Sequence, residues 1–358
     1  MTHLYINGLG MVSPRGDTLD ALFAEAEAAP STWLKCIDPA YAGFIEPANI
    51  RRMGRLIKMA MVAAKKCLAD GQVTVPDAII TGTGLGCMED TEKFLKTIIS
   101  EEGSMASPTA FIHSTHNTIS SQIAIALKCQ GYNSTYVHRA FSFESAVMDA
   151  ILQLHETQPG TAKNILVGGV DEMSPSVYEI MRKLYFWKKT LEATRLQDSS
   201  TPGTIAGEGM TYCLLSNQPS VRSYARLVGL RQVYKPSGFT EIQTALTHFL
   251  ETHNLTLSGI DLVMLDNNGD TRFDHDYHRL TGLFPSGATL ACFKHLCGEY
   301  FSASAFGLLL SALVIHRNEV PASAVMRLGE RKSFRNVLLY NQFRGIGHSF
   351  YLLSDVKV

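Results

Sequence analysis

The sequence predicts an α/β fold built in layers, with helices on both faces of its sheets. Two observations carry this prediction: short apolar runs that end in glycine recur along the chain, and stretches with helical periodicity lie between them. Strands that alternate with helices in this way are typical of layered α/β proteins. A third observation, the similarity of two of the strand and glycine units, indicates two similar halves.

Four apolar runs are predicted to be buried strands that lead into tight turns. They are HLYINGLG at the start of the chain, AIITGTGLG ending at Gly86, NILVGGVDE around Gly168 and Gly169, and DLVMLDNNGD ending near Gly269. The clearest helical stretches are RRMGRLIKMAMVAAKKCLADG, residues 51–71, and FSFESAVMDAILQLHE, residues 141–156.

The unit at residues 78–86 is echoed at residues 261–269, which favours two topologically similar halves. The segment from Gln197 to Gly209 is rich in small and turn-forming residues, as expected of a boundary or, equally, of a surface loop inside one domain. We predict an N-terminal half at residues 1–205 and a C-terminal half at residues 206–358, packed as one integrated unit.

The composition describes a globular protein with a large core, since 46% of its 358 residues are hydrophobic and 18% are charged. A balance of 32 basic and 33 acidic residues gives no global field that would attract nucleic acid or an anionic membrane. The chain shows no signal peptide and no run of about 20 uncharged apolar residues. We therefore expect a cytoplasmic protein that neither binds nucleic acid nor inserts into membranes.

Seven scattered cysteines, an odd number, fit neither a disulfide framework nor paired zinc ligands, and we expect reduced thiols. One of them, Cys297, follows Lys294 and His295 closely and is a candidate reactive thiol, although small cysteines are more often packing residues. His275 and His278 are three residues apart, but a solvated helix start is a simpler explanation than a metal site. We expect no metal and no cofactor.

Six strings in collinear order, spread over nearly the whole chain, resemble those of the β-ketoacyl synthase branch of the thiolase-like superfamily. They are INGLGMVSPRG at 6–16, the helical stretch at 51–71, GTGLG at 82–86, LVGGVDEMS at 166–174, GEGM at 207–210 and NQFRGIG at 341–347. The resemblance implies a thiolase-like fold, in which two pseudo-repeated halves form a five-layered α-β-α-β-α architecture.

In such synthases a cysteine at the start of a buried helix takes up the acyl chain as a thioester, and two histidines stabilise the enolate formed from a malonyl extender. This sequence departs from that pattern at all three positions. Phe141 stands at the nucleophile position, Asn268 replaces the first histidine, and Glu299 replaces the second, five residues after the retained Lys294. The alternative is that the three are ordinary core or loop residues, although each lies inside its own recognisable string.

Chains that keep this fold and lose the cysteine resemble chain length factors, the non-condensing partners of type II polyketide synthases. The resemblance implies a heterodimer with an active ketosynthase, in which this chain shapes the acyl tunnel while the acyl carrier protein is met through the partner. The string VHRAFSFESA most resembles the subunit found with aryl polyene synthases. The rival hypothesis is an enzyme of altered chemistry, a malonyl decarboxylase or acyltransferase acting through Asn268 and Glu299.

The same resemblance suggests further site residues. A helical stripe after the glycine turn would line the tunnel together with Phe141, although a plain core stripe is equally consistent with its spacing; its members are Met88, Thr91 and Leu95. The glycine-rich string would form a gating loop that includes Phe343, Arg344, Gly345 and Gly347. The polar segment 107–127 would contact the partner through Phe111, His113, Thr115 and Asn117.

Three arginines near the start of the first long helix, Arg51, Arg52 and Arg55, offer a docking patch for an acidic carrier protein. A solvated helix face is the other interpretation of these three residues, with the active partner making the carrier contact.

Overall fold

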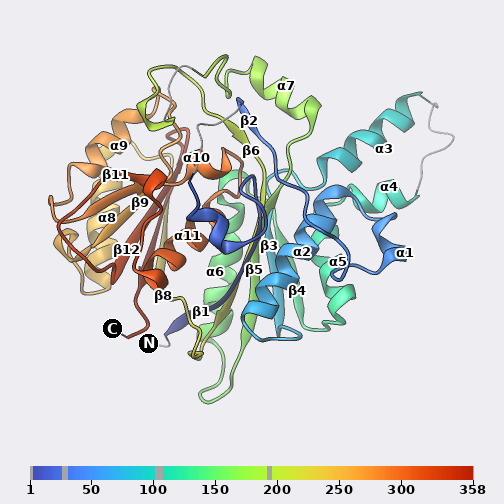
Figure 1. The fold of residues 1–358 in the computed structure, drawn as a ribbon, viewed down its shortest axis with the longest axis horizontal. Helices are drawn as coiled ribbons and strands as arrows, with labels where there is room; N and C mark the ends of the chain where they lie inside the picture. The colour runs from blue at the N-terminus through green and yellow to red at the C-terminus, as the bar shows by residue number, and fades with distance from the viewer. Residues whose placement is uncertain (1–2, 26–30, 101–107, 192–195, 358) are drawn as a thin grey trace.

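The computed structural model describes residues 3–25, 31–100, 108–191 and 196–357. Its strands and longer helices alternate along the chain (Figure 1). The first part contains β1 (Leu4–Val12), β2 (Trp33–Leu34), α1 (Pro47–Ile50), α2 (Arg55–Asp70), β3 (Ala78–Gly82), α3 (Met88–Ser100), α4 (Pro108–His113), α5 (Thr118–Leu127), β4 (Tyr132–Tyr136), α6 (Ser142–His155), β5 (Asn164–Asp171), α7 (Pro175–Lys183), β6 (Ala206–Gly207) and β7 (Gly209–Ser216).

The second part repeats the alternation. It contains β8 (Ala225–Tyr234), α8 (Phe239–Thr252), β9 (Leu262–Leu265), α9 (Asp274–Thr281), β10 (Thr289–Cys292), α10 (Lys294–Cys297), α11 (Ser304–Arg317), β11 (Val325–Arg327), β12 (Asn336–Phe343) and β13 (Gly347–Ser354). None of the helices in the described part of the chain is both long and apolar enough to cross a membrane.

The strand order shows that the two parts share one topology. Hydrogen bonds connect the strands in the order β11-β10-β9-β12-β13-β8-β1-β7-β5-β3-β4. Numbered within its own part, each set of five main strands has the order 3-2-4-5-1, and in both sets the first three are parallel and the last two antiparallel to their neighbours. The predicted pseudo-repeat is therefore confirmed, and the echoed units contain β3 and β9, which occupy equivalent places.

The two sets meet at one short seam, where Leu4, Tyr5 and Ile6 of β1 pair with residues 225–227 of β8. By this topology β7 completes the first repeat, so the repeats divide between Ser216 and Ala225. The boundary that we predict at 205/206 lies before β6 and β7.

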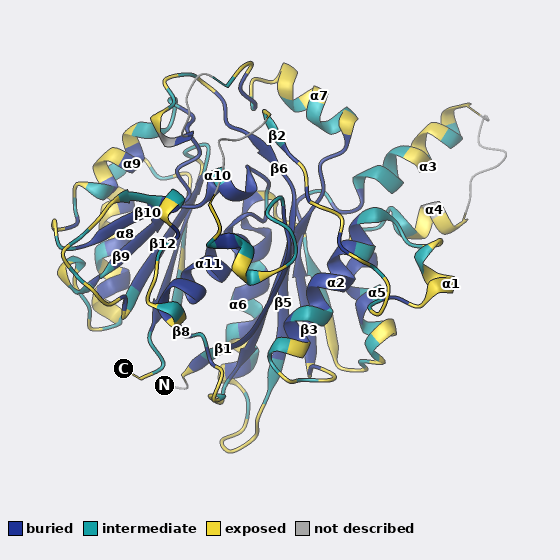
Figure 2. Cartoon of the chain, in the orientation of Figure 1, coloured by how far each residue is buried: buried dark blue, intermediate teal, exposed yellow. Residues whose placement is uncertain are grey.

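The packing of the helices produces the five layers. α2 and α5 cover the outer face of the first sheet through a core cluster that includes Ile57 and Ile123, and α8 and α9 cover the outer face of the second through one that includes Leu246 and Leu280. Between the sheets, α6 and α11 share the largest core cluster, and nearly every residue of α11 is buried (Figure 2). The layered thiolase-like α/β fold expected from the sequence is confirmed.

Element boundaries differ from the sequence prediction in small ways. α2 begins at Arg55 rather than at residue 51, because Gly54 adopts an extended conformation and serves as its N-cap. The stretch at 141–156 begins one residue late, with Phe141 as the N-cap of α6 and part of a short 3₁₀ turn, Arg139–Phe141. This places Phe141 at the entrance of a central helix.

Candidate functional site

Asn268, Glu299 and Lys294 come together in one buried cluster. The side-chain amide of Asn268 donates to Glu299 Oε2 at 2.9 Å, and Lys294 Nζ lies 2.5 Å from Glu299 Oε1. All three side chains are buried, with exposures of 4% or less. Burial alone would lower the pKa of Lys294, but the Glu299 carboxylate beside it raises that pKa above its ordinary value. The cluster is thus a closed set of partners, with both oxygens of Glu299 bonded within it.

The backbone around Glu299 is held by the short strand β6. Glu299 N donates to Ile205 O at 2.8 Å, and Gly207 N donates to Glu299 O at 2.9 Å. Two glycines make this approach possible: a Cβ on Gly207 would lie 2.1 Å from Cys297 O, and one on Gly298 would lie 2.6 Å from Ala206 O. The GEG string therefore positions Glu299 through close backbone contact.

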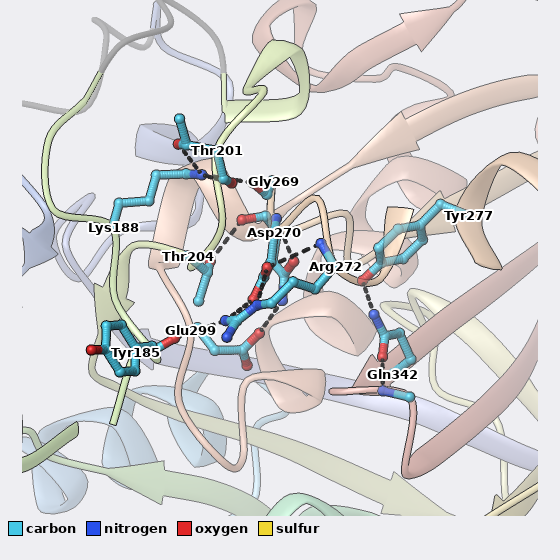
Figure 3. Close-up of polar contacts among 12 residues, drawn as sticks. Tyr185, Lys188, Thr201, Thr204, Gly269, Asp270, Arg272, Tyr277, Glu299 and Gln342 are labelled. Atoms are coloured by element: carbon cyan, nitrogen blue, oxygen red, sulfur yellow. Dashed lines mark hydrogen bonds and ion pairs between the residues drawn. The ribbon is translucent and has the colours of Figure 1, made fainter. Parts of the chain in front are cut away.

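The loop that carries Asn268 is held from both sides (Figure 3). Lys188 Nζ donates to Gly269 O at 2.7 Å, and Thr204 Oγ1 donates to Asn268 O at 2.7 Å. On the other side, Arg272 pairs with Asp270 and donates to Tyr185 O at 2.8 Å. These contacts fix the loop after β9 in one conformation.

A further buried acid, Asp266, lies at the end of the strand that leads to Asn268. Its Oδ2 accepts from the backbone N–H of Gln342 at 2.9 Å, and burial raises its pKa to about 7, opposed by the positive charge of Lys294. Gln342 also donates to Tyr277 and accepts from Gly345 N (Figure 3). Asp266 thereby links the polar cluster to the hairpin between β12 and β13.

Phe141, which we predict to stand at the nucleophile position, lies at the start of α6. The turn is fixed by Ser142 Oγ, which accepts from His138 N at 2.8 Å and donates to Arg139 O at 2.7 Å, while Arg139 has a left-handed φ of 50°. The Phe141 ring is 6% exposed and packs edge-on against Tyr234, with ring centroids 6.3 Å apart. No thiol stands at this helix start, and an aromatic ring fills the place.

The predicted gating loop is a tight hairpin turn. Arg344 and Gly345 have φ of 52° and 65°, and Ile346 N donates to Phe343 O at 3.0 Å, the pattern of a type I′ turn. A Cβ on Gly347 would lie 2.9 Å from the Phe141 ring, so the hairpin packs directly on the nucleophile position. Arg344 lies over the Phe186 ring, 3.9 Å from its centroid.

An aromatic pocket joins this hairpin to the polar cluster. Phe343 lies between Phe301 and Phe186, with ring centroids 5.2 and 6.4 Å away. The same rings line a pocket that also touches Glu299 and that holds room for about one water molecule. Neither Phe186 nor Phe301 belongs to a recognised sequence string, so spacing gave no signal for them.

The residues predicted to line a tunnel lie on α3, where none of the described residues is buried. Met88 and Thr91 are partly buried, and Leu95 is 50% exposed. The alternative of a plain core stripe is therefore wrong. α3 and α4 extend away from the rest of the molecule (Figure 1).

The segment predicted to contact a partner is partly exposed, and four residues of α5, namely Thr118, Ile119, Ser120 and Ile123, are buried. Ser107 lies outside the described residues. Phe111 is 55% exposed, Asn117 is exposed, and His113 and Thr115 are partly buried. Thr115 is used internally, since its hydroxyl lies 2.7 Å from that of Thr118.

The structure bears on three other candidates from the sequence: the arginine patch, the reactive thiol and the histidine pair. Arg55 pairs with Asp38 and, at 2.9 Å, with buried Glu208, so it does not belong to a docking patch with Arg51 and Arg52. Cys297 is fully buried and burial raises its pKa, which keeps it a thiol rather than a reactive thiolate. His275 contacts Asp276, and in the described ranges no group of three or more His, Cys, Asp or Glu side chains is arranged to hold a metal.

Comparison with solved structures shows which known proteins share this fold. A chain from the ishigamide ketosynthase/chain length factor has a TM-score of 0.80 at 16% identity and covers 99% of both chains. A β-ketoacyl synthase from Burkholderia phymatum STM815 has a TM-score of 0.81 at 17% identity, covering 99% of this chain and 100% of its own. The ketosynthase ApeO in complex with its chain length factor ApeC, from Xenorhabdus doucetiae, gives 0.77 at 16% identity over 99% and 98%.

The fold is therefore that of the ketosynthases and chain length factors. Residues 24–197, slightly less than half of the chain, match the family described as β-ketoacyl synthase, N-terminal domain. No protein of curated function matches the sequence.

Proposed function

We propose that this chain is a non-catalytic chain length factor that forms a heterodimer with an active ketosynthase and walls the tunnel of a growing acyl chain. The observation that carries the proposal is Phe141, a packed aromatic ring at the helix start where a condensing enzyme needs a thiolate. A phenyl ring forms no thioester. Loss of a nucleophile from a catalytic unit costs on the order of 10⁶ in kcat.

The polar cluster supports the same conclusion. Enolate stabilisation needs donors that point at the substrate oxygen. Here the Asn268 amide donates to Glu299, and Lys294 is paired with the same carboxylate, so these polar groups are directed at one another. This arrangement also weighs against a decarboxylase or acyltransferase acting through Asn268 and Glu299.

A large unpartnered apolar face supports an obligate partner. Seven large hydrophobic side chains on or beside α3, α4, α5 and β4 are 48% exposed or more. They are Leu95, Ile99, Phe111, Ile112, Ile125, Tyr132 and Val137. Soluble monomers rarely expose a patch of this kind, and β4 is also an edge strand, open to pairing on one side. We define these seven residues as the α3–β4 face and propose that the ketosynthase covers it.

The finer substrate assignment follows from the sequence resemblance. The string VHRAFSFESA at the entrance of α6 supports a partner that builds a conjugated polyene on an acyl carrier protein. A cytoplasmic location and carrier contact through the partner belong to the same proposal.

The decisive experiment is coexpression with an intact ketosynthase encoded beside this chain. We expect the tagged chain to co-purify with that ketosynthase as a stable 1:1 complex, and the complex, but not the isolated chain, to condense malonyl carrier protein. A stable homodimer that condenses or decarboxylates malonyl carrier protein by itself would refute the proposal. In that event, loss of turnover in Glu299→Ala would identify the altered enzyme.

Substitutions in the α3–β4 face sharpen the test. The double variant Phe111→Asp/Ile112→Asp introduces two charges into the apolar face and is expected to abolish co-purification. Its matched control is Val221→Asp/Leu328→Asp, at two other exposed hydrophobic residues, 101% and 75% exposed, which should leave the complex intact. If both variants co-purify equally well with the ketosynthase, the partner does not bind to the α3–β4 face.

A further inference from the structure

A groove remote from the residues discussed above lies where the two halves meet. Its floor is β8, from Arg226 to Arg231, and its walls come from α6, α8 and the start of β1. β8 pairs with β1 only through residues 225–227, so in the described part of the chain the rest of that strand edge has no neighbouring strand. The groove encloses about 710 Å³, within the usual range for a small-molecule site.

The polar groups that line this groove are strongly biased in charge. Six basic side chains converge on it from α6, from α8 and the residue that follows it, from β8 and from the N-terminal segment: His3, His155, His248, His253, Arg226 and Arg231. Among the residues that the structure describes, no aspartate or glutamate lines it. The chain as a whole has a formal net charge of −1, so this concentration of one sign is a local property.

The pKa of His3 agrees with a positive local field. The pKa of His3 lies below its ordinary value, first because of the positive charge of Arg226 and second because of burial. Burial also lowers the pKa of His253, whose ring packs against Gly229 at the base of the groove. An anion placed between these groups would relieve the repulsion and favour their charged forms.

Most of the remaining lining is apolar, apart from Thr252 and Asn254. Met148 and Ile151 of α6 and Phe249 of α8 face the groove on opposite sides of β8. The floor from Arg226 to Arg231 is roughly 17 Å long at the rise of an extended strand. A ligand that fills the groove therefore needs both a negative group and an apolar body.

We propose that this groove binds an organic phosphate with an apolar chain. A phosphate monoester carries a charge of about −1.5 to −2 near neutral pH and three strong acceptor oxygens, which suits several histidines and arginines better than a single carboxylate does. The apolar chain lies along Met148, Ile151 and Phe249. The site does not depend on the proposed function, because it shares no residue with the α3–β4 face or with the cluster of Asn268, Glu299 and Lys294.

The test measures binding of decyl phosphate to the full chain by isothermal titration calorimetry below the aggregation concentration of the ligand. We expect saturable 1:1 binding that weakens with added salt. The double variant Arg231→Ala/His248→Ala removes two exposed basic side chains of the groove and is expected to weaken binding about tenfold or more. The matched control, Lys183→Ala/Lys332→Ala, removes two exposed basic side chains outside the groove and should bind like the parent chain.

Two comparison ligands complete the test. Decyltrimethylammonium has the same chain with the opposite charge, and inorganic phosphate has the charge without the chain; both should bind at least about tenfold more weakly than decyl phosphate. Unchanged affinity in the groove variant, or equal binding of decyltrimethylammonium, overturns the proposal. Inorganic phosphate that binds as tightly as decyl phosphate overturns the assignment of the apolar chain.

Discussion

The polar cluster around Glu299 and the α3–β4 face differ in how many of their side chains find partners within the chain. In the cluster, Asn268, Lys294 and Glu299 are buried and bonded to one another, and the loop around them is clamped by Lys188 and Thr204. On the α3–β4 face, large apolar side chains stand in the open beside an edge strand. The polar cluster, which we predict to correspond to the site of a synthase, is closed, and the α3–β4 face, which we propose to bind a partner, is left exposed.

This difference indicates where a substitution should lower the free energy of unfolding and where it should instead weaken the binding of a partner. Removing one member of a closed buried network leaves its partner desolvated and unpaired, which is costly. Changing a side chain on an open face costs the isolated chain little, but it removes what a partner would bury. The two regions should therefore respond in opposite ways to substitution.

The largest expected effect is that of Lys294→Met. The substitution leaves the buried Glu299 carboxylate without its cation, and we expect the free energy of unfolding to fall by about 3–5 kcal/mol. Urea denaturation followed by circular dichroism measures it. The double variant Lys294→Met/Glu299→Leu removes both charges and should recover much of the loss; a single variant as stable as the parent would show that the pair is not coupled.

The next effect is that of Phe141→Ala, which empties the space between the α6 entrance and the hairpin. The ring is 6% exposed and packs on Gly347 and Tyr234, so a loss of about 3 kcal/mol is expected. Thermal unfolding provides the measurement, with Phe141→Leu as the milder control. If Phe141→Ala unfolds at the same temperature as the parent, the ring does not contribute the packing described.

A comparable effect is expected from pH, through buried Glu144 of α6. It accepts from Ser349 Oγ at 2.9 Å, and in the described part of the chain it has no ion-pair partner; burial raises its pKa from 4.5 to about 7. The neutral form is favoured by folding, so the stabilisation is complete below about pH 4.5 and is lost as the pH rises through 7, by about 3 kcal/mol in total.

Denaturation curves between pH 5 and pH 8 measure this loss. Glu172, whose pKa burial raises to about 8, should add a change of the same sign. Glu144→Gln keeps the shape of the side chain and cannot ionise. The free energy of unfolding of this variant should therefore fall less between pH 5 and pH 8 than that of the parent, by the contribution of Glu144. Identical pH dependence in the two proteins would exclude Glu144 as the source.

The smallest effect on stability is expected on the open face. Phe111→Asp/Ile112→Asp changes side chains that are 55% and 54% exposed, so the free energy of unfolding of the isolated chain should change by no more than about 0.5 kcal/mol per site. Chemical denaturation of the isolated chain is the measurement. A loss of several kcal/mol would mean that the face is already covered within the chain.

Much of the fold could be predicted from the sequence because its signals are local. Apolar runs that end in glycine became β1, β3, β5 and β9, and the helical stretches became α2 and α6 with boundaries shifted by a few residues. The identity of residue 141 is also local information, since the sequence itself shows a phenylalanine and no cysteine in VHRAFSFESA.

The site as a whole could not be predicted in the same way. Nothing in the local spacing of Lys188, Thr204 or Gln342 indicates that they contact the segment from Asp266 to Gly269, because these residues come from parts of the chain distant in sequence. Arg55 illustrates the opposite error: beside Arg51 and Arg52 it resembles a surface patch, but Glu208, far along the chain, pairs with it.

The sequence by itself determined the layered α/β class, the pseudo-repeat and the presence of Phe141, rather than a cysteine, before the second helical stretch, because each depends on the order and type of neighbouring residues. Only the tertiary structure decided that Glu299 is closed off by Asn268 and Lys294, that the α3–β4 face lacks a cover, and that six basic side chains gather at the seam of β1 and β8. These features depend on contacts between segments distant in the chain, and such contacts are set by the packing of sheets and helices rather than by local periodicity.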